Sequence, residues 1–145
     1  MAHAEQSITI NRPGNTIFDF ILDGKNSPHW RPSVIDVQQV PGKPLGVGTV
    51  FKQGLKGPGG RRIDGDYEIV ACKPNEHITF QVIAGPARPT GTYTFEPQGN
   101  ATRVTFTLDY EVKGLTQFIM EPMINKSMQS EVATLSILKS YLESQ

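Results

Sequence analysis

The chain has 145 residues, which is the size of one ordinary domain. Hydrophobic residues make up 37% of it and charged residues 19%, a composition that excludes both an intrinsically disordered chain and a membrane-embedded one. Fourteen basic residues balance fourteen acidic ones, which argues against a partner attracted by bulk charge, such as nucleic acid or an anionic membrane surface.

The residues that could bind metal or form disulfides are few. Cys72 is the only cysteine, so neither an internal disulfide nor a thiolate metal cage can form. The histidines, at positions 3, 29 and 77, lack metal-ligand spacing, and we expect no metal. The N-terminal residues lack the features of a secretory signal, and no apolar run reaches the ~20 residues that span a bilayer. We therefore expect a cytoplasmic protein without stable membrane insertion.

The N-terminal part predicts one strand followed by two short helices. Residues 7–11 alternate between apolar and polar at period two, as a strand does. Pro13 marks a helix start, because a proline in the first turn has no backbone donor to lose, and Gly24 marks its end. A short helical stretch follows at residues 26–30, and Pro32 returns the chain to extended geometry.

Strands then follow one another, separated by turns rich in glycine and proline. The predicted strands are residues 34–40, 47–55, 62–72, 76–84, 90–95 and 102–112. The last is the clearest, with one face formed by Val104, Phe106, Leu108, Tyr110 and Val112. Such alternation predicts an antiparallel sheet with one dry face and one face in water.

Two features among these strands have ordinary interpretations. Residues 57–60 are rich in glycine but join two strands and lack the Gly-Lys-Ser/Thr ending of a phosphate-binding loop, so we predict a hairpin turn. Whether this hairpin acts as a lid over a cavity stays open. Arg62, Asp64 and Asp66 alternate in opposite phase to Tyr67, which places them on the wet face of the sheet.

Beyond Gly114 the apolar period becomes helical. The stripe consists of Ile124, Met128, Val132, Leu135, Leu138 and Leu142. Pro122 predicts a break or kink near residues 120–123. Because a sheet with a dry face must cover it, we predict an α+β fold in a single domain, residues 1–145. About six to seven antiparallel strands curve around the long C-terminal helix, with two short helices after the first strand.

Several short motifs occur in an order that is shared with a known superfamily. They are Ile10-Asn11-Arg12-Pro13 before Ile17-Phe18-Asp19-Phe20, then Trp30-Arg31-Pro32, Gly46-Val47-Gly48-Thr49, Tyr93-Thr94-Phe95-Glu96-Pro97 and Ala101-Thr102-Arg103-Val104-Thr105. Over essentially its whole length the chain resembles the START-like (SRPBCC, or Bet v 1-like) superfamily. More narrowly, it resembles the polyketide cyclase/dehydrase and lipid-transport family. The resemblance implies a helix-grip fold, and it says little about activity because the family includes cyclases and carriers.

A sheet bent around one helix tends to leave an apolar cavity, which is a typical small-molecule site. The residues we expect around the ligand are Trp30, Tyr67, Phe80, Val82, Tyr93, Phe95, Phe106, Leu108, Tyr110, Met120, Ile124 and Met128. All of them also have a structural interpretation, the aromatic residues as core and the methionines as gap fillers. A tyrosine that faces an apolar cavity needs a hydrogen-bond partner, which a ligand could supply.

We expect the protein to bind a hydrophobic or aromatic small molecule that is lipid-, isoprenoid- or polyketide-like. Two alternatives stay open. By resemblance, the chain could be a cofactor-independent polyketide cyclase, aromatase or dehydrase that acts on a ligand folded in the cavity. It could also be a protein-interaction module with a packed cavity. No catalytic residue can be identified, since His29 is more readily a surface residue than a general acid or base, and we expect no cofactor. The sequence is compatible with a homo-oligomer but does not predict the oligomeric state.

Overall fold

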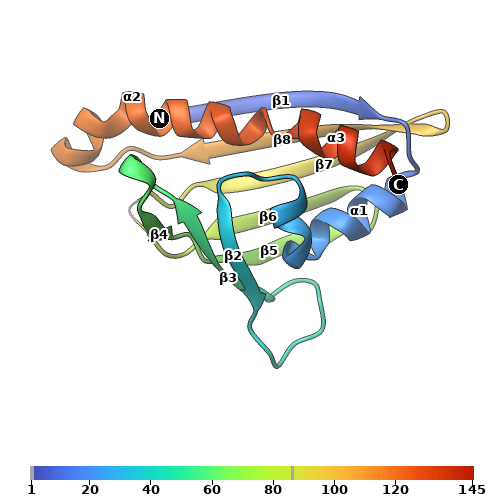
Figure 1. Ribbon diagram of the computed structural model, residues 1–145, viewed down its shortest axis with the longest axis horizontal. Coiled ribbons are helices and arrows are strands. Elements are labelled where there is room, and N and C mark those ends of the chain that lie inside the picture. Colours follow the sequence, from blue (N-terminus) through green and yellow to red (C-terminus); the bar gives the residue numbers. More distant parts are fainter. Residues whose placement is uncertain (1, 86) are drawn as a thin grey trace.

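The computed structural model describes residues 2–85 and 87–145, and Figure 1 shows its elements. The helices are α1 (Gly14–Leu22), the 3-10 helices η1 (Gly24–His29) and η2 (Pro58–Gly60), α2 (Gly114–Val132) and α3 (Leu135–Glu143). The strands are β1 (Ala2–Ile10), β2 (Val34–Gln39), β3 (Val50–Lys56), β4 (Arg62–Asp64), β5 (Tyr67–Lys73), β6 (His77–Val82), β7 (Thr90–Gln98) and β8 (Ala101–Tyr110).

The strands form one antiparallel sheet in the order β1-β8-β7-β6-β5-β3-β2, and β4 pairs with β3 beside this path. The first and last strands pair over their lengths, from Ala2 opposite Tyr110 to Ile10 opposite Thr102. Helices α2 and α3 run along this edge of the sheet (Figure 1). The predicted helix-grip architecture, with two short helices after the first strand and a long helical segment at the end, is confirmed.

The core lies between the concave face of the sheet and the C-terminal helices. The predicted inward face of β8 is buried from Val104 to Tyr110, while Arg103 on the opposite face is exposed. Every member of the predicted helical stripe is buried as well: Ile124, Met128, Val132, Leu135, Leu138 and Leu142. The two apolar patterns therefore face each other, and their burial is the main force that holds helix and sheet together.

The interruption of the C-terminal helix lies further along the chain than predicted. Helix α2 continues through Pro122, and the helical segment is broken at Ala133 and Thr134 instead. Pro122 is exposed, so the carbonyl that loses its helical donor there can be solvated. At the actual break, Thr134 donates from both its backbone nitrogen and its hydroxyl to the carbonyl of Glu131, which closes the last turn of α2.

The strand predicted over residues 62–72 is in fact two strands, β4 and β5, separated by Gly65 and Asp66. The backbone nitrogen of Gly65 donates to the carbonyl of Gln53 at 2.9 Å. The Asp66 carboxylate, rather than a backbone carbonyl, accepts from the Gln53 nitrogen at 3.2 Å. The Asp66 side chain thus replaces one backbone hydrogen bond between β3 and β5. The prediction that Asp66 lies free on the solvent-facing side of the sheet was therefore wrong.

Candidate functional site

A cavity of about 200 Å³ lies between the concave face of the sheet and α2. Its walls come from β3, β4, β6, β8 and α2 together with the loop before β7, and most of its lining side chains are apolar. The interior is therefore not packed solid. A concave, mostly apolar space with a few polar groups is the usual form of a small-molecule site.

The structure divides the predicted site residues into three groups. Seven of them line the cavity: Phe80, Val82, Phe106, Leu108, Met120, Ile124 and Met128. Trp30, Tyr67 and Tyr93, together with Phe80, line a separate void of about 20 Å³ deeper in the core. Phe95 and Tyr110 line neither, because they lie toward opposite ends of the sheet beside wider depressions that open to solvent.

An ion pair lies between the cavity and the void. Arg31, which follows η1, donates from Nε to Oε2 of Glu131 in the last turn of α2 at 3.1 Å. The second oxygen of Glu131 accepts from the Ser33 hydroxyl. Both charged side chains are mostly buried, with 11% and 18% of their surface exposed. Arg31 lines both spaces, so this pair and Phe80 form the partition between them.

The surroundings of Arg31 keep its guanidinium charged. Burial is the largest single influence and would lower the pKa of Arg31, but the negative charge of Glu131, the hydrogen bond to it and the neighbouring Tyr93 and Tyr67 together hold that pKa above its ordinary value. A charge that is paired and hydrogen-bonded inside the protein is tolerated, whereas an unpaired one is not. The pair is therefore a fixed polar boundary of the cavity.

Tyr67 and Tyr93 belong to an aromatic cluster around the void. Tyr67 stacks on Phe51 with ring centroids 5.3 Å apart, and Tyr93 stacks on Phe106 at 4.2 Å. Burial raises the pKa of Tyr67 to about 12, against the opposing influence of the Arg31 charge and a hydrogen bond to Ser27. Burial raises the pKa of Tyr93 as well. Both phenols are neutral near pH 7, so they can donate hydrogen bonds but cannot act as bases.

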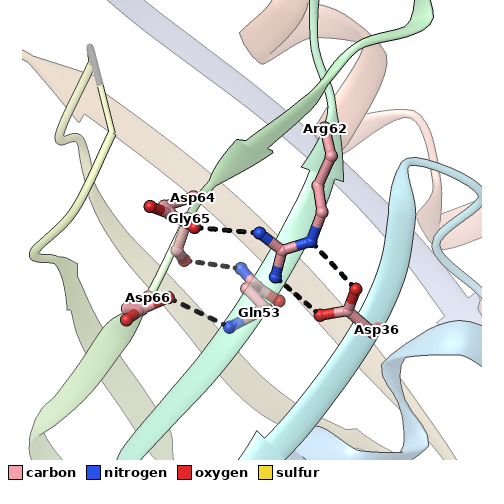
Figure 2. A network of polar contacts seen from close by, with 6 residues as sticks. All are labelled: Asp36, Gln53, Arg62, Asp64, Gly65 and Asp66. Carbon is pink, nitrogen blue, oxygen red and sulfur yellow. Dashed lines mark hydrogen bonds and ion pairs between the residues drawn. The ribbon is translucent and has the colours of Figure 1, made fainter.

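Gln53 on β3 is a polar residue of the cavity wall that the sequence reasoning missed. It lies in phase with Phe51 and Leu55, and only 3% of its surface is exposed. Its Nε2 donates to the carbonyl of Gly65 at 2.9 Å (Figure 2). Its Oε1 is buried and has no hydrogen-bond partner within residues 2–85 and 87–145. The alternation of β3 was the signal that could have placed Gln53 on the inner face.

A network on the outer face of the sheet holds this part of the wall in place. Arg62 on β4 donates to both carboxylate oxygens of Asp36 on β2, at 2.9 and 3.0 Å, and to Asp64 at 3.0 Å (Figure 2). The guanidinium crosses Gly54, where an added Cβ would lie 2.3 Å from Arg62 Nε. Arg62 and Asp64 are exposed, as predicted, and their network ties together the strands behind Gln53.

The remaining candidates do not join the site. His29 is exposed and stacks on Tyr141, with ring centroids 5.0 Å apart. Within the described residues, no group of three or more His, Cys, Asp or Glu side chains is placed to hold a metal ion. No helix of the described chain has the length and apolar character that crossing a membrane requires.

The first half of α2 leaves large apolar side chains exposed beside the cavity. These are Leu115, Phe118, Ile119 and Met123, and Met123 also lines the cavity. Exposed apolar patches are uncommon on proteins that act alone, and they mark surfaces that meet another molecule. The patch and the cavity therefore meet at Met123.

Other lining residues that were not predicted have two origins. Gln117 and Ser127 lie on the same helix as Met120 and Ile124, at spacings of three or four, which the helical period could have shown. Arg31 and Glu131 are 100 residues apart, and no local sequence pattern predicts their contact. The polar part of the site was therefore the harder part to predict.

Comparison with known proteins places the chain in a family. A family model described as "Polyketide cyclase / dehydrase and lipid transport" matches residues 1–143. No curated protein matches the chain. Among solved structures, TTHA0849 from Thermus thermophilus is 20% identical with a TM-score of 0.79, covering 98% of this chain and 97% of that one.

Two further solved structures have the same fold. A START superfamily protein from Mycobacterium smegmatis is 17% identical with a TM-score of 0.74, covering 99% of this chain and 96% of its own. The di-domain ARO/CYC StfQ from the steffimycin biosynthetic pathway is 15% identical with a TM-score of 0.75, covering 99% of this chain and 51% of its own. At these identities the likeness concerns the fold.

Proposed function

The chain belongs to the polyketide cyclase/dehydrase and lipid-transport family, and from this premise we propose that it binds a small hydrophobic or aromatic molecule between the sheet and α2. The observation that carries the proposal is the cavity of about 200 Å³ with mostly apolar walls. Transfer of apolar surface from water into such a space is favourable by roughly 25 cal/mol per Å². The ligand is lipid-, isoprenoid- or polyketide-like in its apolar character.

The volume of the cavity restricts the ligand. An apolar cavity of about 150 Å³ is enough to hold benzene, and sites for drug-sized ligands begin near roughly 300 Å³. A space of about 200 Å³ therefore suits one or two fused rings, or the end of a longer molecule. Met120, Met123 and Met128 line it, and their flexible thioethers can adapt to ligands of different shape.

Native mass spectrometry of the freshly purified protein tests this function, with saturable binding of added 2-naphthol as the second measurement. Ile124→Trp should fill the cavity and abolish both signals, because Ile124 is buried against it. Ile137→Trp is the matched control, since Ile137 is 39% exposed on α3 and should tolerate the larger side chain. The proposal fails if the unaltered protein shows neither a bound apolar mass nor saturable binding.

A second candidate function is a cyclase, aromatase or dehydrase that acts on a ligand folded in the cavity. It is favoured by the neutral phenols of Tyr67 and Tyr93, which are hydrogen-bond donors near the charged Arg31. Both phenols line the small void on the far side of Arg31, however, so a substrate in the cavity would reach them only past Arg31 and Phe80. This placement favours binding over catalysis.

Tyrosine variants separate the two functions. Under the enzyme function, Tyr67→Phe or Tyr93→Phe abolishes turnover of an added polyketide-like substrate, because a phenol that donates to the reacting group is lost. Under the binding function, either variant changes ligand affinity only slightly, since the phenyl ring still fills its place in the aromatic cluster. Turnover that depends on either hydroxyl would make the protein an enzyme.

A further inference from the structure

We propose that Gln53 is the polar anchor of the cavity and accepts a hydrogen bond from a hydroxyl group of the ligand. The ligand class is then an apolar alcohol or phenol, rather than a hydrocarbon. This inference rests on the proposed binding function and deepens it. It depends on the buried Oε1 atom of Gln53, which has no hydrogen-bond donor in the described chain.

The position of Gln53 is an unusual one for an amide. Phe51 and Leu55, two residues away on either side, have apolar side chains on the same face of β3, and Phe51 is fully buried. Glutamine is seldom buried among apolar residues, because its amide then loses its hydrogen bonds to water. A glutamine at this position of a cavity wall therefore calls for hydrogen-bond partners inside the protein.

Only one end of the Gln53 amide has a hydrogen-bond partner. Nε2 donates to the carbonyl of Gly65 at 2.9 Å, while the buried Oε1 accepts from no group of the described chain. A buried acceptor without a donor costs about 1–3 kcal/mol, and native proteins rarely leave one unsatisfied. Gln53 borders the cavity, so a donor can approach its amide from that space.

The contact with Gly65 sets the orientation of the amide. Because Nε2 is turned toward Gly65, Oε1 lies on the opposite side of the same carbon (Figure 2). The terminal torsion of a glutamine is soft. A modest rotation about it can turn Oε1 toward the cavity while Nε2 stays within reach of Gly65. The hydrogen bonds that Gly65 and Asp66 make with the backbone of Gln53 also fix the position of this residue in β3.

The other polar groups around the cavity do not compete for this role. Both oxygens of Glu131 already accept hydrogen bonds, from Arg31 and Ser33. Asp64 Oδ1 accepts from Arg62 on the outer face. Ser127 is exposed at the edge of the cavity and can satisfy its hydroxyl with water. Within the described chain, Gln53 supplies the buried acceptor that is unsatisfied, so the matching ligand group is a donor.

A pair of ligands of nearly equal shape tests the inference. In 2-naphthol and 2-methylnaphthalene a hydroxyl replaces a methyl group, so the ratio of their dissociation constants reports recognition of the hydroxyl. We expect Gln53→Met to reduce the preference for 2-naphthol by about tenfold or more, because the acceptor is lost while the size of the side chain is kept. Ser127→Ala tests the rival hydroxyl of the cavity wall, and Ser130→Ala, at an exposed serine of α2 that does not line the cavity, is the matched control and should keep the preference of the unaltered protein.

The possible results are distinct. Equal ratios in the unaltered protein and in Gln53→Met, or a preference lost in Ser127→Ala instead, overturn the role of Gln53 while leaving the binding function intact. If neither compound binds the unaltered protein, the binding function itself fails. Should Gln53→Met not fold, the ¹³C shift of the Gln53 side-chain carbonyl in the unaltered protein decides. It must move with 2-naphthol and not with 2-methylnaphthalene, and the reverse or an equal change overturns the inference.

Discussion

Arg31 and Glu131 meet across the interior, where Nε and Oε2 lie 3.1 Å apart although the two residues are 100 positions apart in the chain. Their contact joins the segment after η1 to the end of α2, close to the break at Ala133 and Thr134. Both residues also line the cavity between the sheet and α2. The same pair therefore ties the end of α2 to the segment before β2 and forms part of the cavity wall.

The first prediction concerns the loss of one partner of this pair. Glu131→Leu should lower the free energy of unfolding by about 3–5 kcal/mol, because it leaves the Arg31 charge buried and unpaired. The double variant Arg31→Met with Glu131→Leu should recover most of that loss, since no unpaired charge remains. Urea unfolding at constant pH measures both. Glu76→Leu, which removes the exposed contact to Lys73, is the control and should change stability by less than about 1 kcal/mol. A double variant no more stable than Glu131→Leu would contradict this account.

The second prediction concerns alkaline pH. The pKa of Tyr67 is about 12 in the folded protein against an ordinary value of 10.0, so between these values the unfolded chain loses a proton that the folded chain keeps. Stability is therefore fully present below pH 10 and falls between pH 10 and 12, by about 2–3 kcal/mol for a shift of this size. Tyr67→Phe removes this contribution, and its stability should fall less steeply over that range. Urea unfolding at successive pH values checks the difference, and parallel curves would contradict it.

The third prediction concerns acidic pH and the outer network. The hydrogen bond from Arg62 holds the pKa of Asp36 below its ordinary value. The stability that this contact contributes is present above the ordinary pKa of Asp36 and is lost as pH falls through the lowered value. In Arg62→Gln the pKa of Asp36 should rise, as followed by the NMR titration of its carboxyl carbon. Arg103→Gln, which removes an exposed arginine of β8 instead, should leave that titration unchanged.

The fourth prediction concerns Gly91 on β7, which is paired directly with Phe80 on β6. The Phe80 ring crosses the glycine so closely that an added Cβ would lie 2.2 Å from its Cζ. Gly91→Ala should push this ring into the cavity that it lines, and so weaken 2-naphthol binding by about tenfold or more. Gly14→Ala is the control, because the nearest atom to its added Cβ is 3.7 Å away. Unchanged affinity in Gly91→Ala would show that Phe80 does not limit the cavity.

The fold was predictable because its two largest patterns are local. The alternation of β8 and the helical stripe from Ile124 to Leu142 can each be counted along the chain, and their apolar faces must be buried together. Neither pattern depends on a contact between distant residues. The apolar wall of the cavity was predictable for the same reason, since Phe106 and Ile124 lie on those faces.

The polar part of the site required three-dimensional contacts. The division of the predicted strand 62–72 follows from how the Asp66 side chain meets the Gln53 backbone. The role of Arg31 follows from a contact with a helix that begins more than 80 residues later. Pro122 illustrates a different difficulty, because an exposed proline weakens a helix without always ending it, and the break at Ala133 and Thr134 has no comparable sequence signal.

The pairing of β1 with β8 determines when the native sheet can be completed. Ala2 lies opposite Tyr110, so the beginning of the chain has no strand partner until more than a hundred further residues have been synthesised. Until then, β1 presents unsatisfied backbone groups and its inward-facing Ala4, Ile8 and Ile10 to whatever is nearby. Closure of so long a loop is slow compared with the formation of adjacent hairpins. During synthesis β1 therefore stays unpaired until β8 has been made. In that interval its exposed edge makes the nascent chain most prone to aggregation or to binding by a chaperone.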